Sequence, residues 1–245
     1  MIRKILPIFL LVASCIFAFW GCKKVKVSTA DPTRNYFPLI QGKYVTYAVD
    51  SFYYYGDTTG IRLETHCQLK YAITDTFTDS KRRLTYIMDV YYRPYDGAEF
   101  VPQRVILITP QKDSLFYFQD GTQYIKLEFP IKEGYSWDGN IHAQWQDTLY
   151  SYLKGWNYVY QNYHLSYFNG LVSFDNTVSV LETDENINYQ NVDSIPVGSR
   201  TFAKEVYAYN VGMIYKEWTH YTFGGSDTTR DKKGYSVIMR AIDHN

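Results

Sequence analysis

The chain has 245 residues, with 25 basic and 25 acidic side chains and no formal net charge at pH 7. This balance argues against a nucleic-acid partner, because phosphate binding needs a strong positive field. Aromatic residues are in excess: 26 Tyr, 14 Phe and 5 Trp make up 18% of the sequence. Since aromatic and β-branched residues favour half-buried pleated surfaces, the composition predicts a β-rich fold.

The first 21 residues have the organisation of an export signal. Met1–Lys4 is basic, Ile5–Trp20 is apolar and uncharged, and Gly21 is small. A basic start, an apolar run and a small residue at the cut site are typical of a secretory signal peptide. Cys22 follows at once, so we expect a lipoprotein signal peptide over residues 1–21 and acylation of Cys22 as the first mature residue.

Two alternatives to this cleavage site stay open. Cys15, after Val12-Ala13-Ser14, has the better-looking lipobox, but cleavage there would leave the apolar Ile16–Trp20 on the mature protein. We therefore favour Cys22. The other alternative is a permanent anchor, although the apolar run is shorter than the roughly 20 residues of a spanning helix.

Cleavage before Cys22 leaves 224 residues, with 23 basic and 25 acidic side chains, which is enough for one large β domain. Cys67 is then the one free thiol, so no disulfide framework is expected. His66 beside Cys67 suggests a nucleophile or a metal ligand at first sight. Neighbours in a strand point to opposite faces, however, and we expect a buried, inert Cys67.

Residues 22–35 are polar and show no periodic pattern of apolar residues. We predict a flexible tether there, followed by an aromatic-rich domain over residues 36–245. Short alternating runs bounded by turn residues predict strands. We place them at Tyr44–Tyr54, Arg62–Thr76, Leu84–Arg93, Arg104–Thr109, Leu115–Phe118, Tyr124–Phe129, Asp147–Leu153, Ser166–Phe174, Thr177–Thr183, Thr201–Tyr209, Met213–Thr222 and Tyr235–Ile242. A short helix over Tyr152–Tyr163 is an alternative.

Twelve short strands with little helix predict a mainly β fold, an antiparallel curled sheet that forms a half-barrel or a sandwich. A faint repeat adds to this expectation. Two segments read Phe-Pro-aliphatic, namely Phe37-Pro38-Leu39 and Phe129-Pro130-Ile131. In each, two further residues, then a Gly and then an aromatic residue follow. The repeat is either a reused turn or the mark of two related halves, 36–128 and 129–245.

Motifs that would identify a reaction are missing from the sequence. It has no nucleophile elbow, phosphate-binding glycine loop, Cys-x-x-Cys or His-Glu-x-x-His. His142 and Trp145, near Asp138 and Asp147, and His220 beside Trp218 could line a pocket or be ordinary strand residues. We assign no catalytic, metal or cofactor-binding residue. Two facing carboxylates would suit a glycosidase, but the sequence does not show which acids face each other.

Several segments resemble a group of uncharacterised Bacteroidota-type lipoproteins. They are Tyr36-Phe37-Pro38-Leu39-x-x-Gly42-x-Tyr44, Asp75-Thr76-Phe77-Thr78-Asp79, Phe129-Pro130-Ile131-Lys132-Glu133-Gly134-x-x-Trp137 and Glu205-x-Tyr207-Ala208-x-Asn210-Val211-Gly212. The segment from Tyr207 to Ile214 is also similar to strands of envelope proteins with curled sheets, including lipoprotein-carrier-like half-barrels. These motifs imply a fold and give no catalytic residue to carry over.

The expected location is the cell envelope, with the protein anchored to the outer membrane through Cys22. In lipoproteins of the group that the chain resembles, an acidic stretch after the cysteine accompanies surface export. Lys23-Lys24 departs from that pattern and favours a periplasm-facing position. We expect a non-enzymatic module that binds a hydrophobic, glycan or protein ligand on a concave aromatic face. A carbohydrate-binding or carbohydrate-active protein and a structural assembly protein are the alternatives.

Overall fold

The computed structural model describes residues 31–55, 62–143, 151–187, 197–224 and 231–245. Cys15, Cys22 and the tether up to residue 30 lie outside the described residues. The elements are η2 (Pro32–Tyr36), β1 (Tyr44–Tyr55), β2 (Arg62–Thr78), β3 (Leu84–Arg93), β4 (Val101–Pro110), β5 (Ser114–Gln119), β6 (Thr122–Glu128), β7 (Ser136–Asp138), η3 (Ser151–Leu153), β8 (Asn157–Phe168), β9 (Ser173–Ile187), β10 (Val197–Ala208), β11 (Gly212–Gly224) and β12 (Asp231–His244). Within these ranges, no helix is long and apolar enough to cross a membrane.

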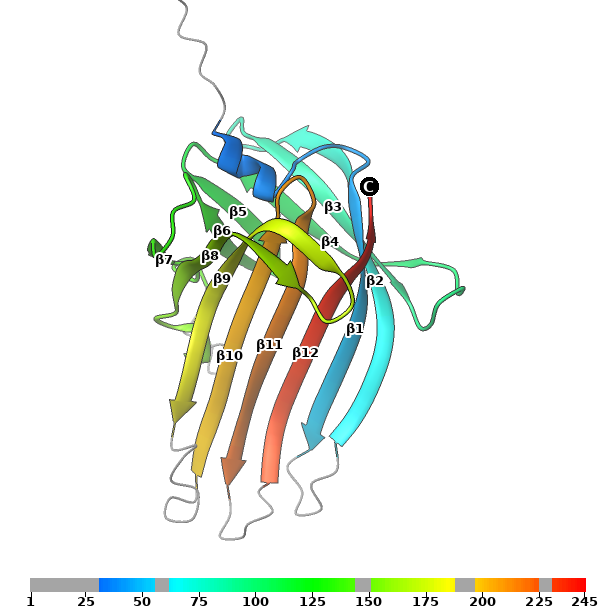
Figure 1. The fold of residues 1–245 in the computed structure, drawn as a ribbon, viewed down its shortest axis with the longest axis vertical. Coiled ribbons are helices and arrows are strands. Elements are labelled where there is room, and N and C mark those ends of the chain that lie inside the picture. Colours follow the sequence, from blue (N-terminus) through cyan, green and yellow to red (C-terminus); the bar gives the residue numbers. More distant parts are fainter. Residues whose placement is uncertain (1–30, 56–61, 144–150, 188–196, 225–230) are drawn as a thin grey trace, which may run out of the picture. The chain divides into compact units, whose positions relative to one another are not determined.

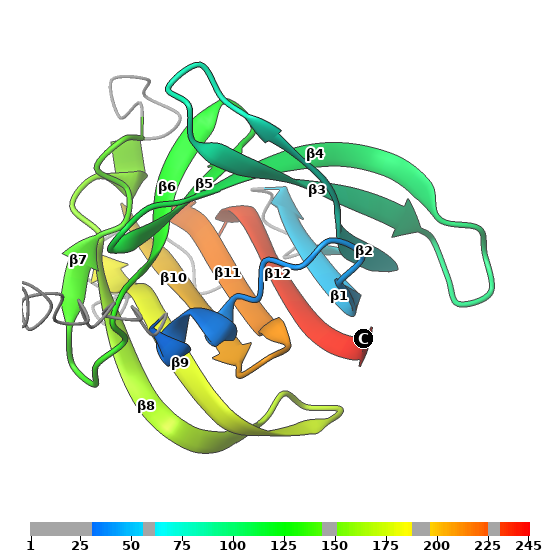
Figure 2. The same ribbon diagram turned by 90° about the horizontal axis from the view of Figure 1, so that it is seen from above.

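All twelve strands belong to one antiparallel sheet, which confirms the predicted fold class. The order is β6-β5-β4-β3-β2-β1-β12-β11-β10-β9-β8-β7, so two sets of six strands meet where β1 pairs with β12. The sheet curls until its edges approach, as the view from above shows (Figure 2). There the Ile125 N–H of β6 donates to the Gly139 carbonyl beside β7 at 2.8 Å. The result is a nearly closed, barrel-like sheet.

The strands differ in length, so one end of the curled sheet, called the open end below, is surrounded by fewer of the described strands. Pairing of β2 with β3 ends at Gln68 opposite Arg93, although β2 begins at Arg62. Pairing of β8 with β9 ends at Leu181, although β9 continues to Ile187. Beyond these points only β9–β12, β1 and β2 continue, as an extended six-stranded sheet (lower half of Figure 1).

The other end is covered by the segment that leads into β1. The Asp31 carboxylate accepts the Thr33 N–H at 2.9 Å and Pro32 follows it, which starts the short helix η2. At its end, Tyr36 is fully buried and donates to the Asn176 side chain at 2.6 Å. The compact unit spans Asp31–Asn245.

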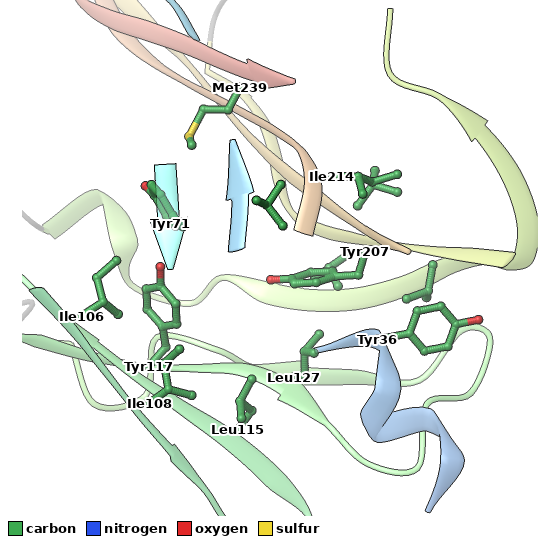
Figure 3. Close-up of a cluster of buried hydrophobic side chains, with 14 of the residues drawn as sticks. Tyr36, Tyr71, Ile106, Ile108, Leu115, Tyr117, Leu127, Tyr207, Ile214 and Met239 are labelled. Carbon is green, nitrogen blue, oxygen red and sulfur yellow. The ribbon is translucent and has the colours of Figure 1, made fainter. Parts of the chain in front are cut away.

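The buried side chains are those that point inward from the strands, where side chains alternate between the two faces. Figure 3 shows Ile106 and Ile108 of β4, Leu115 of β5 and Leu127 of β6 gathered below Tyr207 of β10. The core thus combines aliphatic side chains with fully buried tyrosines, among them Tyr36, Tyr47 and Tyr207.

Two sequence-based assignments around residues 147–174 are wrong. The predicted strand Asp147–Leu153 holds the short helix η3 in its described part, and the alternative helix Tyr152–Tyr163 is mostly β8. Gly155, with φ of +78°, ends the turn after η3 and sets the chain into β8. The predicted strand Ser166–Phe174 covers the end of β8 at Phe168, a turn, and the start of β9 at Ser173. Apolar spacing alone did not reveal this turn, because Leu171 and Val172 lie within it.

Candidate functional site

A cavity of about 600 Å³ lies inside the curled sheet and is lined by aromatic, aliphatic and polar side chains. Its walls include Trp218 and eight tyrosines, Tyr53, Tyr71, Tyr92, Tyr117, Tyr124, Tyr152, Tyr158 and Tyr235. The exposed Tyr53 and Tyr235 mark its mouth, and the buried Tyr117 and Tyr158 lie at its inner end. The volume is within the range of roughly 300–1,000 Å³ that is usual for small-molecule sites.

Strand alternation explains how the sequence places these side chains. On β1, Val49, Ser51 and Tyr53 follow at every second position and all line the cavity. The register sets Val49 opposite Met239 and Tyr53 opposite Tyr235 on β12. Along β1 and β12, the aliphatic pair therefore lies deeper in the cavity than the pair of tyrosines.

Four charged side chains, which we call the ion cluster, form the inner end of the cavity: Lys126, Glu182, Glu205 and Lys216. The Lys126 ammonium donates to Glu182 at 2.9 Å and to Glu205 at 2.7 Å. Lys216 donates to the same Glu205 oxygen, Oε1, at 2.8 Å. The first three side chains are at most 8% exposed and Lys216 is 23% exposed. Lys126, Glu205 and Lys216 line the cavity, whereas Glu182 does not.

The pKa values of the two carboxylates in the ion cluster shift in opposite directions. Burial alone would raise the pKa of Glu205, but the charges of Lys126 and Lys216 outweigh it and hold that pKa below its ordinary value. Burial also dominates at Glu182, and there it raises the pKa, because Lys126 opposes it only in part and Glu205 adds repulsion. Glu205 is thus the firmly ionised member of the pair.

Tyr207 completes the hydrogen bonds of Glu205. Its hydroxyl donates to Oε2 at 2.5 Å, while Oε1 accepts from both lysines. Burial, followed by the negative charge of Glu205, raises the pKa of Tyr207 well above its ordinary value, so this hydroxyl remains a donor. Both carboxylate oxygens of Glu205 therefore have partners inside the protein.

Two nitrogen donors in the cavity walls have no acceptor in the described part of the chain. They are Nε of Arg104 and Nε1 of Trp218, both buried. An unmet buried donor costs about 1–3 kcal/mol. Arg104 is otherwise held by the Tyr71 hydroxyl, which accepts from Nη2 at 3.4 Å, and by Asp120, 3.3 Å from Nη1. The cavity thus contains more hydrogen-bond donors than the protein itself satisfies.

A second, smaller cavity of about 50 Å³ lies on the other side of this inner wall. Tyr71, Tyr117, Lys126 and Glu205 line both cavities and form the partition between them. Figure 3 shows Tyr71 and Tyr117 converging from β2 and β5. Among the described residues, this partition and the covered end of the sheet close the inner side of the large cavity.

The structure places Cys67 and His66 apart, as strand alternation predicts. Cys67 is half-buried and lines the cavity, so the expectation that it is buried is wrong in degree. Burial raises the pKa of its thiol, which fits an unreactive cysteine. His66 points to the opposite face and lies 2.7 Å from the Asp50 carboxylate.

The other sequence candidates divide between the cavity and the rest of the surface. His220 stacks on Tyr152 with ring centroids 3.9 Å apart, and Tyr152 lines the cavity. Burial lowers the pKa of His220. His142 packs on Phe116 instead. Trp145 and Asp147 lie outside the described residues. In the ranges that are described, no three His, Cys, Asp or Glu side chains are grouped as a metal site.

Sequence reasoning did not identify the ion cluster. Glu205 was part of a segment read only as a fold signature, and Lys126, Glu182 and Lys216 received no role. One signal was present: Lys126 sits at an inward position among buried residues of β6, where a lone charge would be costly. This cost predicts an acidic partner for Lys126 but does not identify which residue it is.

The sequence matches no protein-family model and no curated protein. Two solved structures align with most of the chain. One, from Bacteroides fragilis NCTC 9343, is provisionally described as an exported protein with a YMCC-like fold; it has a TM-score of 0.40 and 10% identity, over 84% of this chain and 98% of that one. Another, from Parabacteroides distasonis ATCC 8503, is provisionally described as a lipoprotein; it has a TM-score of 0.31 and 12% identity, over 86% of this chain and 98% of that one. At these values, function has to be argued from this chain's own residues.

Proposed function

We propose that this protein is a lipid-anchored module of the cell envelope that binds a small ligand inside its curled sheet and performs no chemistry on it. The observation that carries the proposal is the aromatic cavity of about 600 Å³. Its mouth lies at the open end of the sheet, and its inner end is a fixed set of ionic hydrogen bonds. A concave, mostly apolar pocket with a few placed polar groups is the usual form of a binding site.

The arrangement of acidic groups favours binding over catalysis. A glycosidase needs two carboxyl groups that flank the substrate, one of them protonated. In this cavity Glu205 has a lowered pKa and partners on both oxygens, and Glu182, whose pKa is raised, is not in the lining. The other lining carboxylate, Asp120, is mostly exposed and pairs with Arg104. These positions support a binding role.

A carbohydrate ligand is the second candidate, because the lining mixes rings with neutral polar groups. Tyrosine and tryptophan rings can stack on sugar faces, and Ser51, Thr65, Gln103 and Gln119 line the same cavity. An assembly protein without a ligand is the third. It predicts that the cavity stays empty under every condition.

Protection of Cys67 from alkylation tests whether the cavity takes a ligand. Cys67 is the one cysteine of residues 23–245, a segment that contains the whole compact unit from Asp31 on. We expect the neutral dye N-phenyl-1-naphthylamine to fluoresce when it binds and to slow labelling of Cys67 by monobromobimane several-fold. Cys67→Ser supplies the blank for labelling and should still bind the dye. An unchanged labelling rate at saturating dye would rule out ligand binding in this cavity.

Replacing Cys22 with Ala is expected to abolish acylation and to release the protein from membranes into the soluble envelope fraction. Only the cysteine after the cut site receives the acyl chains, and acyl chains anchor by burial of their CH₂ groups. Incorporation of an alkyne-labelled fatty acid and membrane fractionation measure both effects. Cys15→Ala is the control and should stay acylated. Attachment that survives Cys22→Ala but is lost in Cys15→Ala would move the cleavage site to Cys15.

A further inference from the structure

We infer that the ligand carries an oxyanion, a carboxylate or a phosphate, which binds at the inner end of the cavity against Lys216 and Trp218, with Arg104 on the facing wall. The inference rests on the proposed binding function and adds the chemical class of the ligand. Three observations carry it: the unused donors, the charge balance of the lining and the position of these residues in the sheet.

The first observation is the number of N–H groups left without an acceptor. The Lys216 ammonium has three hydrogens and donates to one described acceptor, Glu205. Glu205 is already saturated by Lys126 and Tyr207. Nε1 of Trp218 and Nε of Arg104 have no acceptor among the described residues. A ligand that supplies acceptors would complete these groups, and a charged acceptor would do so most strongly.

The second observation is the charge of the lining. The lining contains three positive side chains, Arg104, Lys126 and Lys216, and two negative ones, Asp120 and Glu205. Asp120 lies at the solvent side and is 63% exposed, so its charge is screened by water. Among the side chains that line the cavity, cations thus outnumber anions, and the third carboxylate, Glu182, balances Lys126 from outside the lining.

The third observation is the order of the side chains along the cavity. Lys216 and Trp218 are two residues apart on β11 and share the inward face, and the ammonium lies 5.8 Å from the Trp218 ring centroid. Trp218 is opposite Val237, and the next inward pair toward the mouth is His220 and Tyr235. An anion at Lys216 thus places the rest of a ligand along rings that lead to the mouth.

Two dyes that differ by one anionic group test the inference on residues 23–245. 8-Anilinonaphthalene-1-sulfonate carries the ring system of N-phenyl-1-naphthylamine with an added sulfonate. We expect the anionic dye to bind about tenfold more tightly. Its affinity should fall with added salt, and it should slow alkylation of Cys67, which shows that it is in the cavity.

Substitutions at Lys216 locate the anion. Lys216→Met should remove the preference for the anionic dye and leave the neutral dye unchanged, and Lys216→Arg should keep the preference. Lys204→Met is the matched control, because Lys204 precedes Glu205 on β10 but packs over Tyr167 on the other face. It removes the same charge and should alter neither affinity.

Displacement of the anionic dye identifies the source of the oxyanion. Dodecanoate tests a lipid carboxylate, an oligogalacturonate tests an acidic glycan, and inorganic phosphate tests the headgroup alone. The first two have neutral counterparts, dodecanol and maltohexaose. Displacement by an acid but not by its neutral counterpart supports the inference, and equal displacement by both overturns it.

The outcomes separate this inference from the function on which it rests. If neither dye binds or slows Cys67 labelling, the proposed binding function is wrong. If both dyes bind equally and Lys216→Met changes neither, the binding function stands and the anion inference is overturned. A preference for the anionic dye that persists in Lys216→Met also overturns it.

Discussion

Replacing Glu205 with Gln is expected to lower the free energy of unfolding by about 3–5 kcal/mol at pH 7. The substitution removes the charge that Lys126 and Lys216 share, while Lys126 remains buried with only Glu182 beside it. It also turns an acceptor for the Tyr207 hydroxyl into an amide of mixed polarity. Urea denaturation followed by circular dichroism measures the change.

Glu182→Gln is the matched control and should cost about 1 kcal/mol or less. The raised pKa of Glu182 means that the folded protein already disfavours its charge, and an amide oxygen still accepts from Lys126. Equal losses for both variants would show that the two carboxylates are equivalent, contrary to the geometry of the ion cluster.

The difference between wild type and Glu205→Gln should shrink in acid. The pKa of Glu205 is lower in the folded than in the unfolded protein. Its stabilisation is therefore complete above the ordinary Glu pKa of about 4.3 and is lost as the pH falls below that value. Denaturation at pH 7 and at about pH 3 compares the two conditions. A difference that grows in acid would contradict the assigned direction of the pKa shift.

Replacing Gly234 with Ala is expected to lower the free energy of unfolding by about 3 kcal/mol. A Cβ at this position of β12 would lie 2.2 Å from the His220 carbonyl oxygen and 2.6 Å from Cα of Tyr221. Both are backbone atoms of β11, so relief requires the two strands to separate. The φ of +147° adds strain for any residue with a side chain.

Gly97→Ala is the control for this prediction, because it tests backbone strain without a clash. Gly97 has φ of +86° in the loop between β3 and β4, and a Cβ there meets no atom within 4 Å. It should cost about 1 kcal/mol, the penalty of the left-handed region alone. Thermal and urea denaturation compare the two variants. If Gly234→Ala lowers the free energy of unfolding no more than Gly97→Ala does, β11 and β12 can move apart at little cost, which would contradict the prediction.

The ion cluster also explains why the cavity ends where it does. Lys126 and Glu205 are bonded to each other within the partition between the two cavities. In many proteins, replacing a buried ion pair by aliphatic side chains of similar volume leaves the stability unchanged or increases it. A charged partition gives the large cavity a polar inner end, which an apolar partition would not.

The sequence by itself determined the class of the fold and most of its strands. Alternating apolar residues located Leu84–Arg93 to the residue and the later strands β10–β12 within a few positions. Alternation also separated Cys67 from His66, because a period of two is a local property of an extended chain. The short strand β7 and most of β8 were missed, and the turn between β8 and β9 was placed inside a strand because it contains the apolar Leu171 and Val172.

Only the tertiary structure decided where the sheet closes and what its interior contains. Lys126 lies on β6, Glu182 on β9 and Glu205 on β10, so the pairs are 56 and 79 residues apart in the sequence. No local pattern links such residues; the curl of the sheet brings them together. The sequence could show that tyrosines cover one face of a sheet. The unequal strand lengths and the closure of β6 toward β7 turned that face into a cavity, because both depend on pairing across the whole chain.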